Sequence, residues 1–237
     1  MKSISIRSFL LRSVIVLGTF TLATASARAT TLIDTTPGTT IIGNFGEPNS
    51  ATYGQTITAP AVDHVLTDFT FYMDDYLTLA SPEFVNFEAY VYGWDTVNFH
   101  TTGPALFASA PLSSTNNGGL NGLEAITINT GAVSLTPGGN YVLFFTASNL
   151  FNSTAGQSFF SIRDTNPYAG GHFVFSNNGN NFGQLGSTTW DGGNFGGGIY
   201  DQAFQATFVP EPSSGVLAVV GLACLAWLKS RRRAATA

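Results

Sequence analysis

The residue types needed for nucleophilic hydrolysis are almost absent from the middle of this sequence. Residues 30–208 contain no Gly-x-Ser-x-Gly segment, no Ser-x-x-Lys pair, no lysine and no cysteine. An attacking serine or cysteine needs such an adjacent base or activating turn. His64, His100 and His172 are widely spaced and lack the i, i+4 spacing of a helical zinc site. We therefore predict no catalytic residue and no zinc site.

Paired carboxylates are the other hydrolytic possibility. Glycoside hydrolysis needs two of them about 5–10 Å apart. Glu83 and Glu88 are five positions apart and fall on opposite faces of a predicted strand. Glu124 or Asp68 would face Glu88 only if their strands adjoin. We favour solvated strand carboxylates, and a glycoside hydrolase or lyase stays as an alternative.

Aromatic residues beside Gly, Asn and Asp could bind carbohydrate, because sugar rings stack on exposed flat rings while amides and carboxylates bond their hydroxyls. Trp94-Asp95 and Trp190-Asp191 are the two pairs of this kind, and Tyr168 and Tyr200 border similar loops. The alternative, which we favour slightly, is that the tryptophans fill the end of a sandwich. The sequence leaves both open.

Calcium is the only cofactor that the sequence suggests. Secreted β-sandwiches often bind it at a loop through carboxylate and carbonyl oxygens. Asp74-Asp75 and the segment 191–201 offer such oxygens, without the regular spacing of an EF-hand loop. A solvated acidic turn explains each segment equally simply.

Period-two alternation dominates the region that would position these residues. Alternating apolar and polar residues predict strands with one buried face, and helical periodicity is missing. Clusters of Gly and Asn between the runs favour chain reversals. We predict a single antiparallel β-sandwich of jelly-roll type over residues 30–208, with a core of phenylalanines and aliphatics, and a closed barrel as the alternative. The predicted strands are 52–59, 65–73, 85–92, 125–129, 141–148, 158–163, 172–176 and 202–209.

Charge is distributed very unevenly along the chain. Residues 30–212 contain one basic residue, Arg163, against all 14 acidic residues, a formal net charge of −13. Such a surface repels phosphate backbones, so we predict no nucleic-acid partner. The single cysteine, Cys224, lies outside this region, so the region has no disulfide.

The amino terminus has the layout of a secretory signal peptide. Lys2, Arg7 and Arg12 precede an apolar stretch, and Ala27-Arg28-Ala29 supplies a small-x-small cleavage pattern. We predict removal of residues 1–29 by the Sec and signal-peptidase machinery.

The carboxyl terminus has three parts in order. Val209-Pro210-Glu211-Pro212 is extended, because each proline restricts itself and the residue before it. Residues 216–228 carry no charge and would form roughly 20 Å of helix, short for a hydrocarbon core of about 30 Å. A basic cluster then holds its end on the cytoplasmic side. The cluster is Lys229, Arg231, Arg232 and Arg233.

This order resembles the PEP-CTERM sorting signal of Gram-negative bacteria. The resemblance covers residues 209–237 and implies that an exosortase, a membrane-embedded cysteine transpeptidase, recognises the Pro-Glu-Pro element and removes the helix and basic tail. It also implies a link to exopolysaccharide or biofilm.

These expectations describe a non-enzymatic protein that is exported across the inner membrane, anchored there transiently, and then found at the cell surface or in the extracellular matrix. A carbohydrate-binding module is the alternative function. The expected partners are the export machinery, the exosortase, the membrane during processing, and extracellular polysaccharide.

Overall fold

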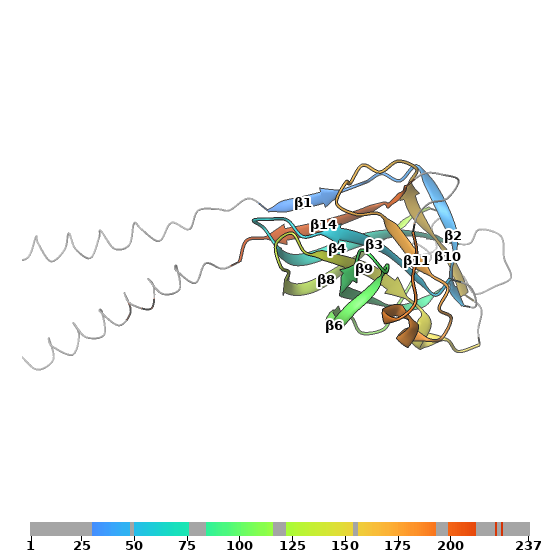
Figure 1. Ribbon diagram of the computed structural model, residues 1–237. Helices are drawn as coiled ribbons and strands as arrows, with labels where there is room; N and C mark the ends of the chain where they lie inside the picture. Colours follow the sequence, from blue (N-terminus) through green and yellow to red (C-terminus); the bar gives the residue numbers. More distant parts are fainter. Residues whose placement is uncertain are drawn as a thin grey trace, which may run out of the picture.

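Antiparallel strands make up nearly all of the regular structure in the computed structural model (Figure 1). The structure describes residues 30–47, 50–75, 84–115, 122–153, 156–192 and 199–211, together with Gly221 and Cys224. The predicted signal peptide with Ala27 and Ala29, and the predicted carboxyl-terminal helix, lie outside these residues, apart from those two positions. In the described part of the chain, no helix has the length and apolar character needed to cross a membrane.

The strands form two sheets of seven strands each. In the first sheet, β4 pairs with β8 on one side and with β14 and β10 on the other, and β1, β2 and β13 extend it. Its strands are β1 (Thr31–Asp34), β2 (Thr40–Glu47), β4 (Val65–Asp75), β8 (Glu124–Ser134), β10 (Gly156–Arg163), β13 (Asp201–Gln202) and β14 (Phe204–Val209).

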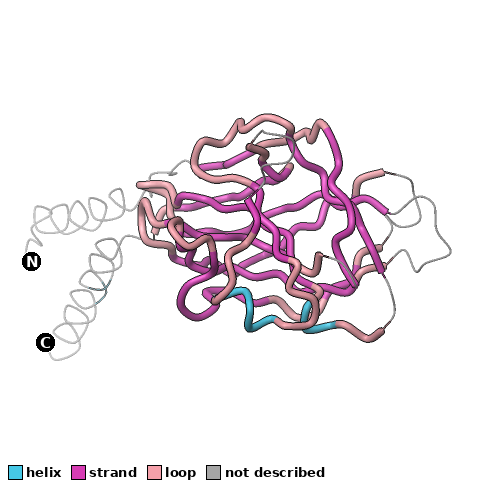
Figure 2. The backbone as a smooth tube through the Cα atoms, turned by 45° about the vertical axis from the view of Figure 1, so that its right-hand side comes forward, coloured by secondary structure: helices cyan, strands magenta, loops and turns pink. Residues whose placement is uncertain are grey.

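The second sheet follows the order β12, β11, β3, β9, β5, β6, with β7 also paired to β5. Two short 3-10 helices are drawn in cyan in Figure 2: η2 (Ser148–Leu150) follows β9 and leads to β10 of the first sheet, and η3 (Phe182–Gly186) lies between β11 and β12. The strands of the second sheet are β3 (Thr52–Thr58), β5 (Asn86–Asp95), β6 (His100–Ala108), β7 (Leu112–Ser113), β9 (Asn140–Thr146), β11 (Phe173–Ser176) and β12 (Asp191–Gly192).

Phenylalanine rings from both sheets meet in one core. Phe71 of the first sheet lies 4.9 Å from Phe145 of the second, measured between ring centroids, and Phe45 meets Phe87 at 6.3 Å. The two sheets therefore pack face to face in a sandwich-like arrangement, and the predicted all-β fold with a phenylalanine core is confirmed. The fully buried phenylalanines are Phe45, Phe69, Phe71, Phe87, Phe144, Phe145, Phe160, Phe173, Phe204 and Phe208.

Alternation explains why the strands bury the faces they do. Phe204, Ala206 and Phe208 of β14 are buried, and the residues between them are half-buried. The predicted alternation in β4 holds from Phe69 but shifts at Leu66, which is fully buried beside an irregularity in the pairing with β8 and β14. A bulge of this kind inserts an extra residue, so the alternation of buried and exposed side chains shifts by one position.

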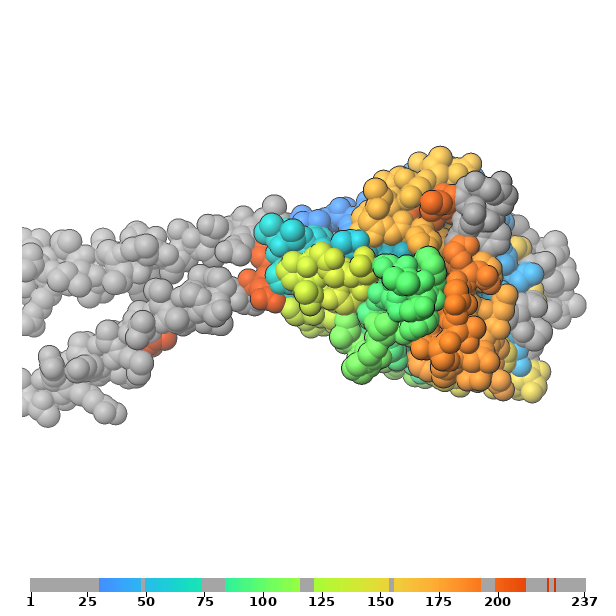
Figure 3. All heavy atoms as spheres, in the orientation of Figure 1, coloured from blue at the N-terminus to red at the C-terminus, as the bar shows by residue number. Residues whose placement is uncertain are grey.

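The second sheet also buries part of its outer face. Tyr90, Val142, Phe144 and Val174 point away from the main core and are covered by η3 and the residues that follow it. Figure 3 shows this segment in orange, next to β6 in green. An outer face covered in this way explains why β9 is buried along nearly its whole length.

The first and last strands of the domain are neighbours. β1 pairs antiparallel with β14, and Thr31 lies opposite Phe208. Both ends of the described domain therefore leave from the same end of the sandwich, as Figure 1 shows at the left.

Candidate functional site at the end of the last strand

Glu211 lies just beyond β14 and makes specific contacts with the domain. Its Oε1 atom accepts a hydrogen bond of 2.5 Å from Ser134 Oγ and lies 3.0 Å from His64 Nε2. These contacts lower the pKa of Glu211, the Ser134 bond contributing most. The carboxylate is half exposed, at 54% of its side-chain surface, so it is held at the surface rather than buried.

His64 is held in position by its own backbone and ring contacts. Its carbonyl accepts a bond of 3.0 Å from Leu135 N, next to Ser134. Its Nδ1 atom lies 3.0 Å from the carbonyl oxygen of Val62. Both ring nitrogens therefore face oxygen atoms, and these two contacts orient the ring.

Asp63, the residue before His64, contacts the beginning of the first strand. Its Oδ2 atom accepts a bond of 2.7 Å from Thr31 Oγ1, and only 8% of the residue is exposed. The adjacent residues Asp63 and His64 thus contact the beginning of β1 and the residue that follows β14 by two. The short loop that contains Asp63 and His64 therefore contacts both the first strand and the segment after the last strand.

The structure describes only part of the predicted sorting signal. Val209 ends β14 opposite Val65, Pro210 is half-buried, and Glu211 is exposed. Pro212 and the basic residues Lys229, Arg231, Arg232 and Arg233 lie outside the described residues.

The tryptophans do not offer open faces for sugar stacking, which corrects that part of the carbohydrate prediction. Trp94 is 6% exposed and Trp190 is 2% exposed. Their rings meet edge to face at 5.4 Å, and Trp190 Nε1 donates to the carbonyl of Leu185 at 3.0 Å. The structure brings the two residues together in the buried cluster on the outer face of the second sheet, and not at the end of the main core.

The two aspartates beside these tryptophans lie in different settings and make different contacts. Asp95 closes the turn between β5 and β6 by accepting bonds from Val97 N at 2.7 Å and Asn98 N at 3.0 Å. Hydrogen bonds from the Asn98 side chain and backbone lower the pKa of Asp95 to about 2. Asp191 is exposed on β12, opposite Phe175.

Tyr168 has a structural role. Its hydroxyl donates to the carbonyl of Thr58 at 3.1 Å and accepts from Thr58 N at 3.1 Å, while its ring packs 5.9 Å from Phe204. Tyr200 packs against the main core as well. Neither ring stands free at a loop as the carbohydrate prediction supposed.

The calcium candidates give no cluster among the described side chains. Asp74 and Asp75 end β4 opposite Phe159 and Ser158, but their side chains are outside the description. Asp191 and Asp201 lie on separate short strands, one exposed and one buried. Within the described ranges, no three His, Cys, Asp or Glu side chains are grouped to hold a metal ion.

The carboxylates considered for glycoside hydrolysis lie in different sheets. Glu88 is on β5 and accepts from Tyr90 Oη at 2.7 Å, whereas Glu124 begins β8 and accepts from Thr115 N at 2.9 Å. Asp68 is on β4, which does not pair with β5. The strand neighbourhood that this alternative required is not formed, and Glu83 is outside the described residues.

A buried carboxylate links the two sheets near β13. Asp201 accepts bonds from Gln55 Nε2 and from Tyr168 N, both at 2.8 Å. Burial raises the pKa of Asp201 to about 6, against these hydrogen bonds and nearby Arg163, which lower it. Sequence reasoning considered this residue only as the end of the calcium candidate segment 191–201 and did not predict its burial, because an isolated aspartate in a strand gives no signal of burial.

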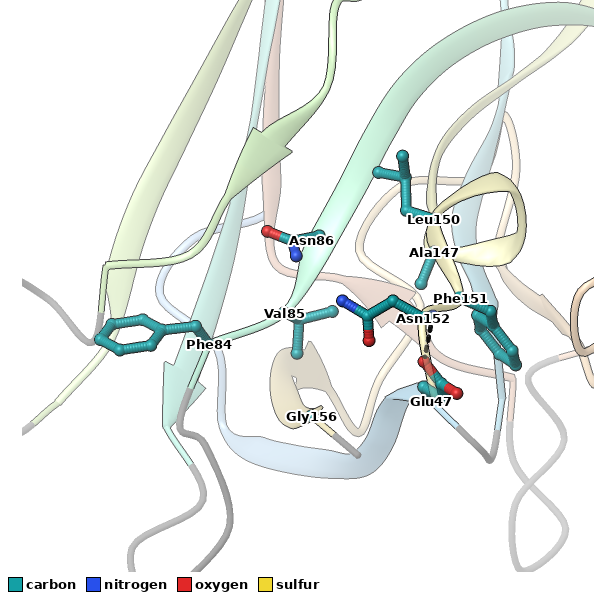
Figure 4. Close-up of a pocket in the computed structure, with 9 residues that line it drawn as sticks. All are labelled: Glu47, Phe84, Val85, Asn86, Ala147, Leu150, Phe151, Asn152 and Gly156. Carbon is teal, nitrogen blue, oxygen red and sulfur yellow. Dashed lines mark hydrogen bonds between the residues drawn. The ribbon is translucent and has the colours of Figure 1, made fainter. Parts of the chain in front are cut away.

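One surface cavity of about 130 Å³ lies at the far ends of β2 and β9 (Figure 4). Glu47 borders it and accepts bonds from Asn152 N at 2.9 Å and Ser153 N at 2.8 Å. Figure 4 shows the Asn152 amide pointing toward Val85. The lining combines amides, one carboxylate and apolar side chains: Glu47, Phe84, Val85, Asn86, Ala147, Leu150, Phe151, Asn152 and Gly156.

Sequence reasoning identified Glu211 but not its partners. His64 and Ser134 are distant from it in the chain, and neither belongs to a motif. No signal in the sequence brings them together, because their proximity to Glu211 depends on β8 and β14 both pairing with β4.

Comparison with known proteins gives no family assignment. No protein-family model and no curated protein matches the sequence. A structure of the infectious bursal disease virus Gt strain aligns with 79% of this chain and 42% of its own chain, at 14% identity and a TM-score of 0.31. The chain thus spans less than half of that viral chain, and a likeness of this size supports no argument about function.

Proposed function

We propose that this chain is a non-enzymatic, exported protein of the cell surface or extracellular matrix, delivered by two removable ends. Residues 1–29 would act as the signal peptide and residues 209–237 as a PEP-CTERM sorting signal for an exosortase. The observation that carries the proposal is the position of Glu211, which lies two residues after the last strand and presents its carboxylate at the surface.

The pairing of β1 with β14 supports this arrangement. A chain that is attached to a membrane at both ends needs both ends to face the same way. The opposition of Thr31 and Phe208 meets that requirement without any linker. The tail would hold the domain close to the inner membrane until processing at the Pro-Glu-Pro segment, after which the domain would join the exopolysaccharide or biofilm matrix.

For the domain at residues 30–208, we propose the finer classification of a jelly-roll β-sandwich. The two antiparallel sheets with a shared phenylalanine core support it. Its acidic surface is compatible with neutral polymers, since it would repel nucleic acid and acidic polysaccharide alike.

Processing in an exosortase-containing host tests the proposal. We expect Glu211→Ala, and separately deletion of residues 229–233, to abolish the processed form and retain the chain in the inner membrane. Asp191→Ala, a change of another exposed carboxylate, is the matched control and should be processed normally. Unchanged mature mass and location in both altered chains would refute the sorting proposal.

Carbohydrate binding is the second candidate function, and the cavity beside Glu47 now favours it more than the tryptophans do. The Asn86 and Asn152 amides in its lining, beside apolar side chains such as Val85 and Leu150, are suitable groups for binding hydroxyls. We expect Asn86→Ala to reduce retention on a neutral polysaccharide, while Val97→Ala, at an exposed turn, leaves it unchanged. Equal retention of both variants would remove this candidate.

A further inference from the structure

We propose that His64 and Ser134 form a built-in binding site for the Glu211 carboxylate, which holds Glu211 on the domain and slows capture of the sorting motif by the processing enzyme. This inference rests on the proposed sorting function. It adds a regulatory contact that the sorting motif alone does not contain.

The site is assembled by the register of the first sheet. Val65 of β4 lies opposite Ser134 of β8 on one side and opposite Val209 of β14 on the other. These three residues form one row across the sheet. His64 precedes this row by one residue, and Glu211 follows it by two, so the ends of three neighbouring strands bring the groups together.

The partners of Glu211 are fixed before it binds. Ser134 belongs to the β4–β8 ladder, and the His64 backbone is bonded to Leu135 N. The His64 ring is oriented by the contact between Nδ1 and Val62 O. Binding therefore orders mainly the short segment after Val209, which limits the entropy that the contact must overcome.

Few basic side chains are available in this domain to contact Glu211. Residues 30–212 contain a single Lys or Arg, and that residue, Arg163, donates from Nη1 to the carbonyl of Pro37 at 2.8 Å. In a strongly acidic domain, the motif glutamate thus faces a histidine ring and a hydroxyl group and not another carboxylate. The other charged group in this loop, Asp63, is engaged by Thr31 and not by Glu211.

The contact of Glu211 with Ser134 and His64 would compete with binding of Glu211 by the processing enzyme. An enzyme that recognises the glutamate side chain needs the oxygen that Ser134 and His64 occupy. The observed capture rate is then the intrinsic rate multiplied by the fraction of molecules in which the segment is free. Because the pair is exposed, we expect a modest effect: removal of either partner should speed processing by about 2- to 5-fold.

Pulse-chase processing of the full chain in the host tests the rate. His64→Ala, Ser134→Ala and the double variant are compared with wild type, with His100→Ala as the matched control. We expect faster conversion in the three site variants and no change in the control. If Glu211→Ala blocks processing while the site variants convert at the wild-type rate or more slowly, the sorting function stands and the binding site is refuted.

A second measurement does not depend on processing. Carboxyl NMR of the full-length chain in detergent, with labelled glutamate, follows the titration of Glu211. Because Ser134 and His64 lower its pKa, we expect Ser134→Ala and His64→Ala each to raise the midpoint toward the ordinary value for glutamate. A midpoint that neither substitution moves would overturn the binding site, even if the chain is never processed.

Discussion

Glu211 and Asp201 show how differently this domain treats two of its carboxylates. Glu211 stays exposed and is stabilised as an anion by a hydroxyl and a histidine ring. Asp201 is fully buried, and burial opposes its ionisation although Gln55 and Tyr168 N both donate to it. The first arrangement suits a group that must be released and recognised, and the second suits a permanent link between sheets.

Asp201 should make stability depend on pH between about 4 and 6. Its folded pKa of about 6 exceeds the ordinary value of 3.8, so its stabilising contribution is complete below about 4 and is lost as the pH rises through 6. Asp201→Asn cannot ionise. We expect the free energy of unfolding of wild type, relative to this variant, to fall by on the order of 2 kcal/mol from pH 4 to pH 7.

Urea unfolding of the full chain, followed by the fluorescence of buried Trp94 and Trp190, measures this difference. Comparing the variant with wild type at each pH cancels the contributions of the other titrating groups. A difference that stays constant from pH 4 to pH 7 would show that Asp201 does not titrate in this range.

The bulge in β8 provides a test of backbone strain. Gly131 has φ of 69° and Ala132 has φ of 74°, and both are exposed. A Cβ atom at Gly131 would meet nothing within 4 Å, so packing does not complicate either substitution. Alanine in this region of backbone conformation is strained, and glycine is not.

We therefore expect the two substitutions at this bulge to act in opposite directions. Gly131→Ala should lower the free energy of unfolding by roughly 1 kcal/mol, and Ala132→Gly should raise it by about 0.5 kcal/mol. Urea denaturation provides both values. Changes of the same sign at the two positions would contradict the role given to positive φ.

The cluster on the outer face of the second sheet should be structural. Trp190 packs against Phe144 at 5.3 Å and Trp94 at 5.4 Å between centroids and holds the segment around η3. We expect Trp190→Ala to lower the free energy of unfolding by about 3–5 kcal/mol. Val97→Ala, at a residue that is 79% exposed, should change it by less than about 0.5 kcal/mol.

Thermal and urea unfolding separate this role from sugar binding. A stable Trp190→Ala chain that has lost only polysaccharide retention would support the original stacking interpretation, and a destabilised chain supports the structural one.

The sequence predicted strands well where one face is buried and poorly at the edges. Alternation in 65–73, 85–92 and 202–209 appears as β4, β5 and β14 because these strands pack against the phenylalanine core. The edge strand β6 was not predicted, since most of His100–Ala108 is exposed and no alternation is required there. The burial of Trp94 depends on a distant irregular segment that covers it, and such cover leaves no periodic signal.

Prediction of the site from the sequence was limited for a similar reason. The position of Glu211 after a terminal strand follows from the pattern of residues 202–209. Its contacts with His64 and Ser134 depend on which strands neighbour β14, and strand order is decided by long-range packing that single-sequence periodicity does not encode.

The arrangement of the whole domain is compatible with the proposed delivery function. Neighbouring β1 and β14 place both ends of the described domain at one end of a sandwich with a formal net charge of −13 over residues 30–212, and the Asp63–His64 loop contacts Thr31 and Glu211. Under the proposed function, the removable segments must be accessible and the folded domain must not depend on them. The core, formed by strands between Thr31 and Val209, meets that requirement.

Intact mass spectrometry of the protein recovered from the envelope and medium of its host tests this account most directly. We expect a chain that begins at Thr30 and ends within or next to Pro210-Glu211-Pro212, without the basic tail. Recovery of the complete chain of 237 residues from the cytosol, with both ends present, would contradict the account.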